Sequence, residues 1–396
     1  MEVDGKMRIA VVGPHSVSQN GIGDYTSRLI EEFRLQAPCS ITAVTERLHI
    51  KPDHQLRNWR GRELPSYWPY AFLEAIDAVR PHLVHIQHGR YLGYGRDFIR
   101  FLTGLNDRRI PCVVTLHSVW SPTLLRRWPV RFFRMLAANN AQVIVHHRAG
   151  TLTLLEKFGI PPNRITVIPH GTWSSKDISA IKNLRSMGIE VSIENKRIVL
   201  FAGNIFYRKG LHILLRAFPA VVRQIPDACL LVVGNKRIDN LLDRFYCFCL
   251  NALIHQGLKE GWLIYRSQYV PDEELWTHIT TAEIAAFPYL RRFGSSSGIF
   301  HRVLAAGRPA ICSNIQTFAE AIEAWGESLT ELFLPPNDVE AWSHILIRIL
   351  SDEHLRNQAK EASIILGRET SWPLVAQEHL RLYKSLLSPA SIQELN

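Results

Sequence analysis

Serine and glycine residues at the predicted start of a helix indicate an anion site in the second half of the chain. Ser296, Ser297 and Gly298 begin an apolar stretch, and Gly307 ends the helix that this stretch predicts. Hydroxyl groups and the unpaired N–H groups of a first helical turn bind phosphate, and the helix dipole favours the same charge. These residues therefore predict a phosphate site.

A second candidate anion site lies upstream, after the strand-like run RIVLFAG. That run ends at Gly203, and the next segment, NIFYRKG, places Arg208 and Lys209 side by side. Cations are unfavourable at the start of a helix unless an anion is bound there. The pair is therefore interpreted as ligand-binding, with ordinary solvated charge as the alternative. Two such sites in one half of the chain predict a ligand with two phosphates.

Continuous apolar runs predict the strands that position these residues. Uninterrupted hydrophobicity, in contrast to alternation, is typical of parallel strands that helices cover on both faces. Two series of runs, separated by a polar stretch that ends at Lys196, predict two doubly wound α/β domains. The predicted strands start at or near Arg8, Ile41, Leu83, Cys112, Gln142 and Ile165, and then at Arg197, Cys229, Trp262, Glu283, Pro309 and Thr330.

The same alternation predicts the domain boundaries. Residues 1–172 are expected to form the first domain, residues 173–196 a linker and residues 197–370 the second domain. Residues 371–396 predict an amphipathic helix that crosses back to the first domain. Ligands of open parallel sheets bind at the carboxyl ends of the strands, so a crevice between the domains is the expected active site.

Charge is unevenly distributed along the 396 residues. Residues 1–170 hold 22 Lys and Arg against 13 Asp and Glu, whereas residues 171–396 hold 24 against 23. The basic first half favours an anionic partner, such as a phospholipid surface, a lipid-linked phosphate or an acidic polymer. Nucleic acid is not expected, because no binding module is recognised and the charge is dispersed.

The cysteines and the apolar runs predict a cytoplasmic protein. Six cysteines without paired CxxC spacing indicate neither a disulfide framework nor a zinc site. Cys247 and Cys249, in the run YCFCL, are expected to be buried in a helix. No apolar run approaches the roughly 20 residues that span a bilayer. A peripheral position at the inner face of the membrane is compatible with the basic first half.

The segment LLRRWPVRFFRMLA, residues 124–137, interleaves arginines with aromatic residues. A helix of this composition suits an anionic lipid surface, and it makes Arg127 and Arg131 candidates for the acceptor side. The alternative, which is favoured, is an ordinary domain helix with a buried aromatic face and solvated arginines.

Four segments, in order, resemble the GT-B glycosyltransferases and in particular their large retaining group, family 4. SQNGIGDYTSRL resembles that family's GGIG turn, TLHS its TxH strand end and VIPHG its VIPNG domain junction. AGNIFYRKGLHILLRAF, LVVG, VPDEEL, SSGIFHRVLAAGRPAI and a final TSW helix follow as in the family's second domain. The resemblance covers nearly the whole chain. It implies two Rossmann-like domains that face a central cleft, a nucleotide-activated sugar as donor, retention of configuration, and neither metal nor other cofactor.

In the second domain, the resemblance implies a donor site. Lys209, assisted by Arg208, would hold the donor diphosphate. Val270 is expected near the nucleotide base, and Gly203 and Gly234 end strands close to the nucleoside. A leaving nucleoside diphosphate develops negative charge, which cations and fixed N–H dipoles stabilise when no metal does.

In the first domain, the resemblance implies a reacting centre. Gly21 and Gly23 would let the backbone approach the donor, with a shaped loop as the alternative, and a helix is expected from Asp24. His117 matches the TxH histidine and would face the sugar hydroxyls, a satisfied core histidine being the alternative. His88 is a candidate for the acceptor side. Gly23 and His117 are the catalytic candidates. No nucleophile is assigned, because the usual proposal is that the leaving phosphate deprotonates the acceptor.

Several positions that carry a charged residue in the family carry a different residue in this chain. Gly294 and Arg302 stand where the family has the glutamates of an EX7E pair, and Asn204 stands where an arginine is common. Arg302 is interpreted as a contact to ligand phosphate or ribose, with pairing to a carboxylate such as Glu320 as the alternative. The missing glutamates leave the identity of the donor open.

These observations predict a metal-independent retaining glycosyltransferase. Its acceptor would belong to a surface polysaccharide, a glycolipid or a metabolite. The alternative is a GT-B-shaped subunit that has lost catalysis and supports an active partner, which the missing glutamates favour. A nucleotide-sugar epimerase is disfavoured, because no acidic base is recognised near the sugar.

Overall fold

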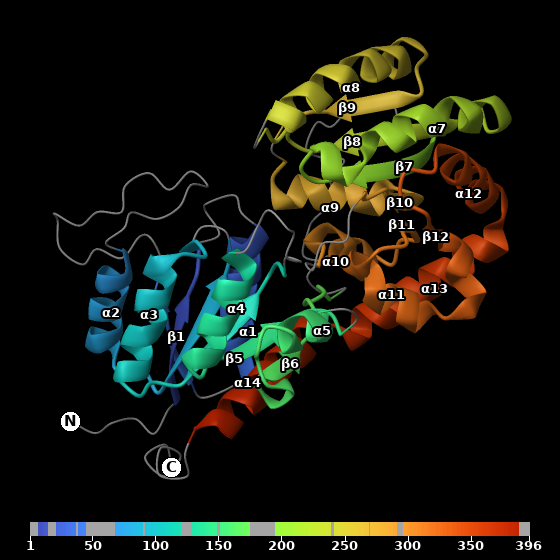
Figure 1. The fold of residues 1–396 in the computed structure, drawn as a ribbon. Coiled ribbons are helices and arrows are strands. Elements are labelled where there is room, and N and C mark those ends of the chain that lie inside the picture. The colour runs from blue at the N-terminus through green and yellow to red at the C-terminus, as the bar shows by residue number, and fades with distance from the viewer. Residues whose placement is uncertain are drawn as a thin grey trace. The chain divides into compact units, whose positions relative to one another are not determined.

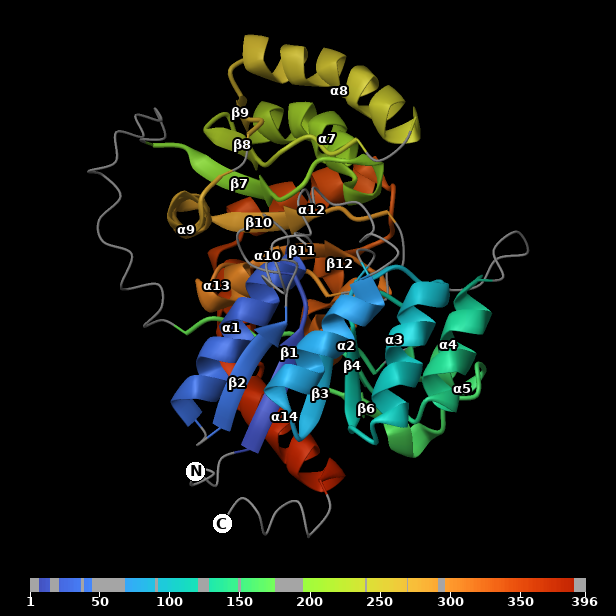
Figure 2. The same ribbon diagram turned by 90° about the vertical axis from the view of Figure 1, so that its left-hand side faces the viewer.

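The computed structural model describes residues 7–14, 21–36, 39–44, 68–89, 92–119, 128–148, 151–174, 195–238, 241–268, 270–290 and 296–387. The chain divides into two compact units, each with one parallel β-sheet (Figures 1 and 2). Unit 1 comprises residues 1–171, 293–296 and 372–396, and unit 2 comprises residues 172–292 and 297–371. The predicted α/β class with two doubly wound parallel sheets is therefore confirmed.

Unit 1 has a six-stranded sheet in the order β2-β1-β3-β4-β5-β6. All of its strand pairs are parallel, and each strand lies at a predicted apolar run. The strands are β1 (Met7–Val12), β2 (Cys39–Val44), β3 (Leu83–His88), β4 (Cys112–Leu116), β5 (Gln142–Val145) and β6 (Ile165–Val167).

The helices of unit 1 cover both faces of its sheet. They are α1 (Gly21–Gln36), α2 (Trp68–Val79), α3 (Arg96–Asp107), α4 (Trp128–Ala138), α5 (Thr151–Glu156) and α14 (Trp372–Leu386). Right-handed crossovers place α1 on one face and α2 to α5 on the other. Helix α14 packs beside α1 (Figure 1). The rings of Phe33 in α1 and Tyr383 in α14 lie 5.6 Å apart. The last described helix therefore completes the core of the first sheet.

Unit 2 has a six-stranded parallel sheet in the order β12-β11-β10-β7-β8-β9. Its strands also lie at the predicted runs. They are β7 (Arg197–Ala202), β8 (Ala228–Val233), β9 (Leu263–Arg266), β10 (Ile284–Phe287), β11 (Ala310–Ser313) and β12 (Phe333–Leu334).

Helices also cover both faces of the second sheet. They are α7 (Leu211–Gln224), α8 (Leu241–Lys259), α9 (Asp272–Thr281), α10 (Gly298–Ala305), α11 (Ala319–Trp325), α12 (Val339–Ser351) and α13 (Glu353–Glu369). Right-handed crossovers place α7 and α8 on one face and α9, α10 and α11 on the other. Helix α12 packs against α7, and α13 packs against α10.

Two element boundaries differ from the prediction. Helix α1 starts at Gly21 and not at Asp24, so both predicted loop glycines, Gly21 and Gly23, lie in its first turn. The last predicted strand, from Thr330, begins instead as a 3₁₀ helix over Glu327–Leu332, and only Phe333–Leu334 pairs with β11. Among the described residues, no helix is long and apolar enough to cross a membrane.

Candidate anion-binding site

Strands β7 and β10 are parallel neighbours in the sheet of unit 2, and the connections that follow them run to opposite faces of that sheet. Leu200 of β7 pairs with Ala285 of β10, whereas α7 and α10, the helices that follow these strands, lie on opposite faces of the sheet. Such a switch point opens a crevice at the carboxyl ends of the two strands, which is where open α/β sheets bind ligands. The predicted anion-binding residues of unit 2 follow these two strands.

Two glycines keep side chains away from the strand ends beside this switch point. Gly203, after β7, has φ +114°, and Gly234, after β8, has φ +149°. A Cβ atom on Gly234 would overlap the carbonyl oxygen of Gly203. The two turns therefore pack backbone against backbone, an arrangement that only glycine permits.

A short turn after β7 is joined to the loop after β10. Residues Tyr207–Lys209 form a 3₁₀ turn, and Gly210, at φ +69°, closes it ahead of α7. The N–H of Leu290 donates to the carbonyl of Arg208 at 2.9 Å, and a Cβ atom on Gly210 would overlap the carbonyl oxygen of Pro288. Arg208 and Lys209 are therefore fixed beside the loop that leads to α10.

Tyr289 brings the two predicted anion sites together. The Nζ atom of Lys209 lies 3.6 Å from the centroid of the Tyr289 ring, and the Tyr289 hydroxyl lies 3.0 Å from Ser297 Oγ. Ser297 is the N-cap residue of α10, and Gly298 is the first residue of that helix. The cation after β7 and the start of α10 therefore contact the same side chain.

The ammonium group of Lys209 lies in an unfavourable environment for a cation. Desolvation, with a smaller contribution from the neighbouring charge of Arg208, lowers the pKa of Lys209 to about 7. No carboxylate of the described residues forms an ion pair with it; its contact is with the π-face of Tyr289. An anion bound here would stabilise the charged form of Lys209.

The first turn of α10 lies next to the glycine turn. Ser297 is 6% exposed and makes no side-chain capping bond to its own helix, because its hydroxyl is paired with Tyr289. A Cβ atom on Gly203 would lie 3.5 Å from Ile299 Cγ1. Ser296 precedes the cap and is half-buried. The first turn of α10 therefore lies beside the end of β7.

Arg302 is held inside unit 2 by a carboxylate and by aromatic rings. Its Nη2 donates to Asp272 Oδ2 at 2.7 Å, and its guanidinium carbon lies 4.3 Å from the ring centroid of Trp173. The proposed carboxylate partner Glu320 is wrong, because Glu320 lies near His301 Nε2 at 4.0 Å. The alternative of pairing with a carboxylate is the arrangement present here. A direct contact to a ligand stays a prediction.

Val270 lies two residues before α9 and packs against the core of unit 2. Its side chain is half-buried. Asp272, which pairs with Arg302, begins α9 and was not among the predicted site residues. Its only signal in the sequence is a place in the VPDEEL segment. Tyr289 was missed too, because a tyrosine after a strand has no distinctive spacing.

In unit 1, His117 uses both ring nitrogens within the protein. Its Nε2 lies 2.7 Å from Gln87 Oε1, and its Nδ1 lies 3.3 Å from His146 Nε2. The side chain is 8% exposed, and the ring of Tyr25 packs on it edge-on at 4.8 Å. This is the geometry of the alternative, a satisfied core histidine. A contact between His117 and a sugar stays a prediction.

His117 belongs to a cluster of buried rings, which we call the histidine cluster. Burial and the neighbouring histidines hold the pKa values of His85, His117 and His146 well below the usual range, and burial lowers the pKa of His379 to about 4. His85 Nδ1 lies 2.5 Å from the hydroxyl of Tyr383 in α14. The members are His85, His117, His146, His170 and His379, with Tyr25 and Tyr383.

His88, the candidate for the acceptor side, is buried in unit 1, and a contact with an acceptor stays a prediction. The side chain is 1% exposed, and its Nε2 lies 2.9 Å from the carbonyl oxygen of Gly93. The rings of Phe98 and Phe132 both lie 4.7 Å from it. Burial lowers the pKa of His88 to about 4. His88 is part of an aromatic core.

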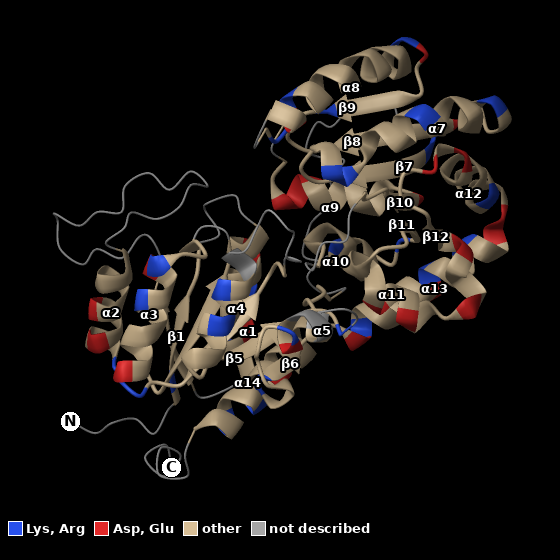
Figure 3. Ribbon diagram, in the orientation of Figure 1, with Lys and Arg blue, Asp and Glu red and all other residues tan. Residues whose placement is uncertain are grey.

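Helix α4 buries its aromatic face. Phe132 and Phe133 are each 2% exposed, and Phe133 stacks on Phe158 at 4.9 Å. Arg131 and Arg134 are exposed on the other side, where Figure 3 shows blue segments on α4. The favoured alternative, a domain helix with solvated arginines, is the arrangement present. Arg127 and Gly294 lie outside the described residues.

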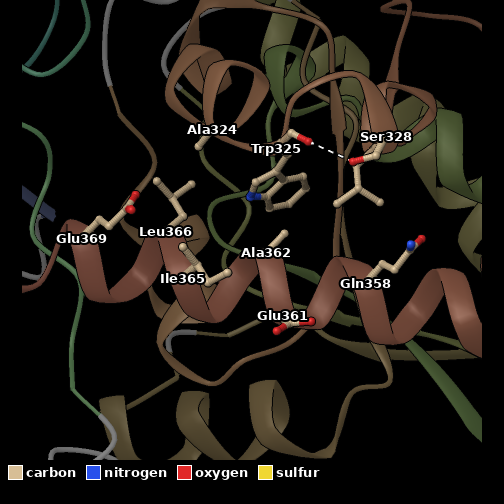
Figure 4. Close-up of a pocket in the computed structure, with 10 residues that line it drawn as sticks. Ala324, Trp325, Ser328, Gln358, Glu361, Ala362, Ile365, Leu366 and Glu369 are labelled. Atoms are coloured by element: carbon tan, nitrogen blue, oxygen red, sulfur yellow. Dashed lines mark hydrogen bonds between the residues drawn. The ribbon is translucent and has the colours of Figure 1, made fainter.

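A separate cavity of about 460 Å³ lies between α11, the following 3₁₀ helix and α13 (Figure 4). Trp325 and Leu366 form part of its apolar wall, and Glu361 and Glu369 lie on α13 beside it. None of the predicted site residues lines this cavity. It is therefore not part of the candidate anion-binding site.

Two family models match the chain in succession. The model described as Glycosyltransferase Family 4 matches residues 23–172, and the model described as Glycosyl transferases group 1 matches residues 185–364. The phosphatidyl-myo-inositol mannosyltransferase of Mycobacterium tuberculosis is 28% identical over 98% of this chain and 99% of that protein. The O-antigen chain mannosyltransferase B of Escherichia coli is 26% identical over 47% of this chain and 45% of that protein. The chain spans about half the length of several curated relatives that it matches.

Solved structures share the fold over nearly the whole chain. Anabaena HepE in complex with UDP-glucose superposes with a TM-score of 0.69 at 16% identity, over 96% of this chain and 100% of that chain. The sucrose-phosphate synthase of Thermosynechococcus elongatus gives a TM-score of 0.69 at 19% identity, over 96% of this chain and 99% of that chain. At these identities, the likeness shows the fold alone.

Proposed function

Because the chain belongs to the family 4 glycosyltransferases of GT-B fold, we propose that it transfers a sugar from a nucleotide diphosphate sugar to an acceptor. The observation that supports this proposal most directly is that Lys209 and Ser297 both contact Tyr289, Lys209 over its ring and Ser297 at its hydroxyl, at the switch point of unit 2. A diphosphate can span such a pair, and the relatives that resemble the chain include mannosyltransferases.

In the proposed reaction, the bond between the anomeric carbon and the diphosphate oxygen breaks, and the diphosphate leaves with both bonding electrons. Lys209, Arg208 and the first-turn N–H groups of α10 stabilise the charge that develops on it. An acceptor hydroxyl bonds to the same face of the sugar, and the leaving phosphate takes its proton. The configuration at the anomeric carbon is thereby retained without a protein nucleophile or a metal.

The acceptor is proposed to be part of a surface polysaccharide, a glycolipid or a small metabolite. The excess of basic residues in the first 170 positions favours an acceptor with phosphate groups or one held at an anionic membrane surface. A peripheral position at the inner face of the membrane would bring the enzyme to such an acceptor.

The proposal is tested by titrating nucleoside diphosphates and nucleotide sugars into the protein and by assaying transfer or hydrolysis of each donor that binds. A bound donor that is hydrolysed or transferred supports the enzyme. Lys209→Ala should weaken binding of that donor by about tenfold or more, the usual effect of losing a charged contact. If no nucleotide binds, the proposed donor site is wrong.

A second candidate function is a binding subunit without catalysis. The observation that favours it is the pairing of Arg302 with Asp272, which puts a neutralised cation where the resemblance implies a glutamate. Such a subunit would bind a nucleotide but would neither hydrolyse nor transfer any sugar. Turnover of any donor therefore separates the two functions.

A further inference from the structure

The first two turns of helix α8 in unit 2 are apolar on the outer face as well as on the inner one. Its inner face packs Tyr246, Leu250 and Ile254 into the core of the unit. Its outer face presents large apolar side chains to solvent. These are Leu241, Leu242, Phe245 and Phe248, which are 54% to 80% exposed, and Ile238, just before the helix, is 52% exposed.

The spacing of these residues produces one continuous stripe. Leu241, Phe245 and Phe248 are four and three residues apart, so they lie one above the other on the helix surface. A surface helix ordinarily turns its apolar stripe inward and leaves polar residues outside. A contiguous exposed apolar patch of more than a few hundred Å² is typical of an interaction site. The outer face of α8 exposes four large apolar side chains next to one another.

Cations accompany this apolar stripe. Arg244 is exposed and lies one turn from both Leu241 and Phe248, and Arg237 is exposed just before the helix. Asp243 is the only acidic residue of the α8 sequence, and it is 4% exposed. Lys and Arg lie at both ends of α8 (Figure 3). The outer face therefore combines exposed aromatic rings with positive charge.

We propose that the outer face of α8 docks unit 2 on an anionic lipid surface. Phe245 and Phe248 would enter the boundary between headgroups and acyl chains, and Arg244 would lie among the lipid phosphates. An apolar stripe alone would suit a second copy or another protein equally well. The exposed cations, without an exposed carboxylate on the helix, favour anionic lipid over those partners.

This surface replaces the one that the sequence indicated. Helix α4 has a similar basic and aromatic composition, but its rings at Phe132 and Phe133 are buried and only its arginines reach solvent. The proposal extends the peripheral membrane position described under the proposed function. It does not depend on sugar transfer, since a catalytically inactive chain would bind lipid through α8 in the same way.

Vesicle binding by the full chain tests the proposal. The protein should sediment with vesicles of phosphatidylcholine mixed with phosphatidylglycerol, less so at high salt, and not with phosphatidylcholine alone. The double substitution Phe245→Ser and Phe248→Ser should weaken binding by about tenfold or more, because it removes both inserted rings. Arg244→Glu should weaken binding several-fold.

Two matched controls lie in unit 1. Leu35→Ser removes an apolar side chain of α1 that is 78% exposed, and Arg131→Glu reverses an exposed charge of α4. Both variants should bind anionic vesicles as the unmodified protein does. Thermal unfolding followed by circular dichroism establishes that each variant is folded.

Cys249 provides a direct reporter on the same face. Its thiol is exposed and adjacent to Phe248, Cys39 is half-buried, and the other four cysteines are buried. In a Cys39→Ser background, an environment-sensitive fluorophore on Cys249 should shift to shorter wavelength when anionic vesicles are added. The shift should be absent with phosphatidylcholine vesicles.

Several results would overturn the proposal. These are failure of the unmodified protein to bind anionic vesicles, undiminished binding by the folded double variant, and loss of binding in Arg131→Glu. A dimer in solution that the double variant converts to a monomer would assign the face to a second copy, which also overturns it. Nucleotide titration of the same variants separates the lipid-docking proposal from the proposed sugar transfer. If no nucleotide binds while vesicle binding depends on α8, only the proposed transferase is wrong.

Discussion

Lys209 and Ser297, 88 positions apart in the sequence, touch the same tyrosine. The ammonium group of Lys209 lies over the ring of Tyr289, and the hydroxyl of that ring pairs with Ser297. The cation after β7 and the helix start after β10 are thereby held at one place in unit 2. The proposed donor site can therefore be tested at a single position, Lys209.

Removing the charge of Lys209 should weaken nucleotide binding without unfolding the protein. We expect Lys209→Met to raise the Kd for a nucleoside diphosphate by about tenfold or more. Its stability should not fall, because the charged form is disfavoured where it lies. Arg216→Ala, which removes an exposed cation of α7, is the matched control. Equal effects of the two changes in a calorimetric titration would contradict the assignment.

Binding of a nucleotide sugar should depend on pH through Lys209. In the protein without ligand, the pKa of the Lys209 ammonium group is about 7. A bound diphosphate raises this pKa, so Lys209 takes up a proton when the ligand binds. Affinity should therefore be greatest below pH 7 and should fall as pH rises above 7. Lys209→Arg stays charged and should remove this dependence. Calorimetry in buffers of different ionisation enthalpy measures the proton uptake. A pH profile that Lys209→Arg leaves unchanged would assign it to another group.

Gly210→Ala should destabilise unit 2 by more than its backbone conformation alone explains. The residue has φ +69°, and its added Cβ would overlap the carbonyl oxygen of Pro288. Gly261→Ala is the matched control, since Gly261 has φ +78° with no atom within 4 Å of an added Cβ. The control should lose about 1 kcal/mol and Gly210→Ala about 2 kcal/mol or more in urea unfolding. Similar losses would mean that the loop after β10 moves aside.

Arg302→Glu should lower stability at pH 7 by about 1–2 kcal/mol, because it exchanges an ion pair with Asp272 for two like charges. Adding Asp272→Arg to the same protein should restore part of the stability. Denaturant unfolding of the four proteins of this cycle gives the coupling energy. A coupling near zero would show that Arg302 does not depend on Asp272.

Acid should destabilise unit 1 through the histidine cluster. Four of its histidines have folded-state pKa values below the unfolded value, so the unfolded chain binds more protons, and stability falls as pH drops through about 6.5 towards 4. These are His85, His117, His146 and His379. His379→Leu should flatten this decline by up to about 1.4 kcal/mol per pH unit. His344→Leu, at an exposed position of α12, should not change it. The melting temperature measured from pH 7 to pH 5 decides between these outcomes.

The strands could be predicted from the sequence because each one is a short run of consecutive apolar residues. Runs such as IleValLeuPheAla in β7 and LeuLeuValVal in β8 are apolar at every position, as strands covered on both faces must be. The start of α1 was harder to predict, since glycines at positions 21 and 23 predict a loop more readily than a helical turn.

The environment of the site residues could not be predicted from spacing. His117 and His88 both end apolar strands, but which atoms meet their ring nitrogens depends on Gln87, His146 and Gly93. Likewise, α4 and α8 both combine aromatic residues with arginine, and only packing decides that α4 buries Phe132 and Phe133 while α8 exposes Phe245 and Phe248. Cys249 was expected to be buried and is exposed for the same reason.

The return of α14 to the first sheet has a consequence for biosynthesis. Unit 1 lacks the partner of Phe33 and His85 until Tyr383 has emerged from the ribosome, whereas nearly all of unit 2 is encoded in one uninterrupted stretch before it. The sheet of unit 2, although synthesised later, can therefore complete its core first. The sheet of unit 1 keeps part of its hydrophobic surface exposed until α14 has been synthesised. During translation, that waiting surface is where chaperones would be expected to bind.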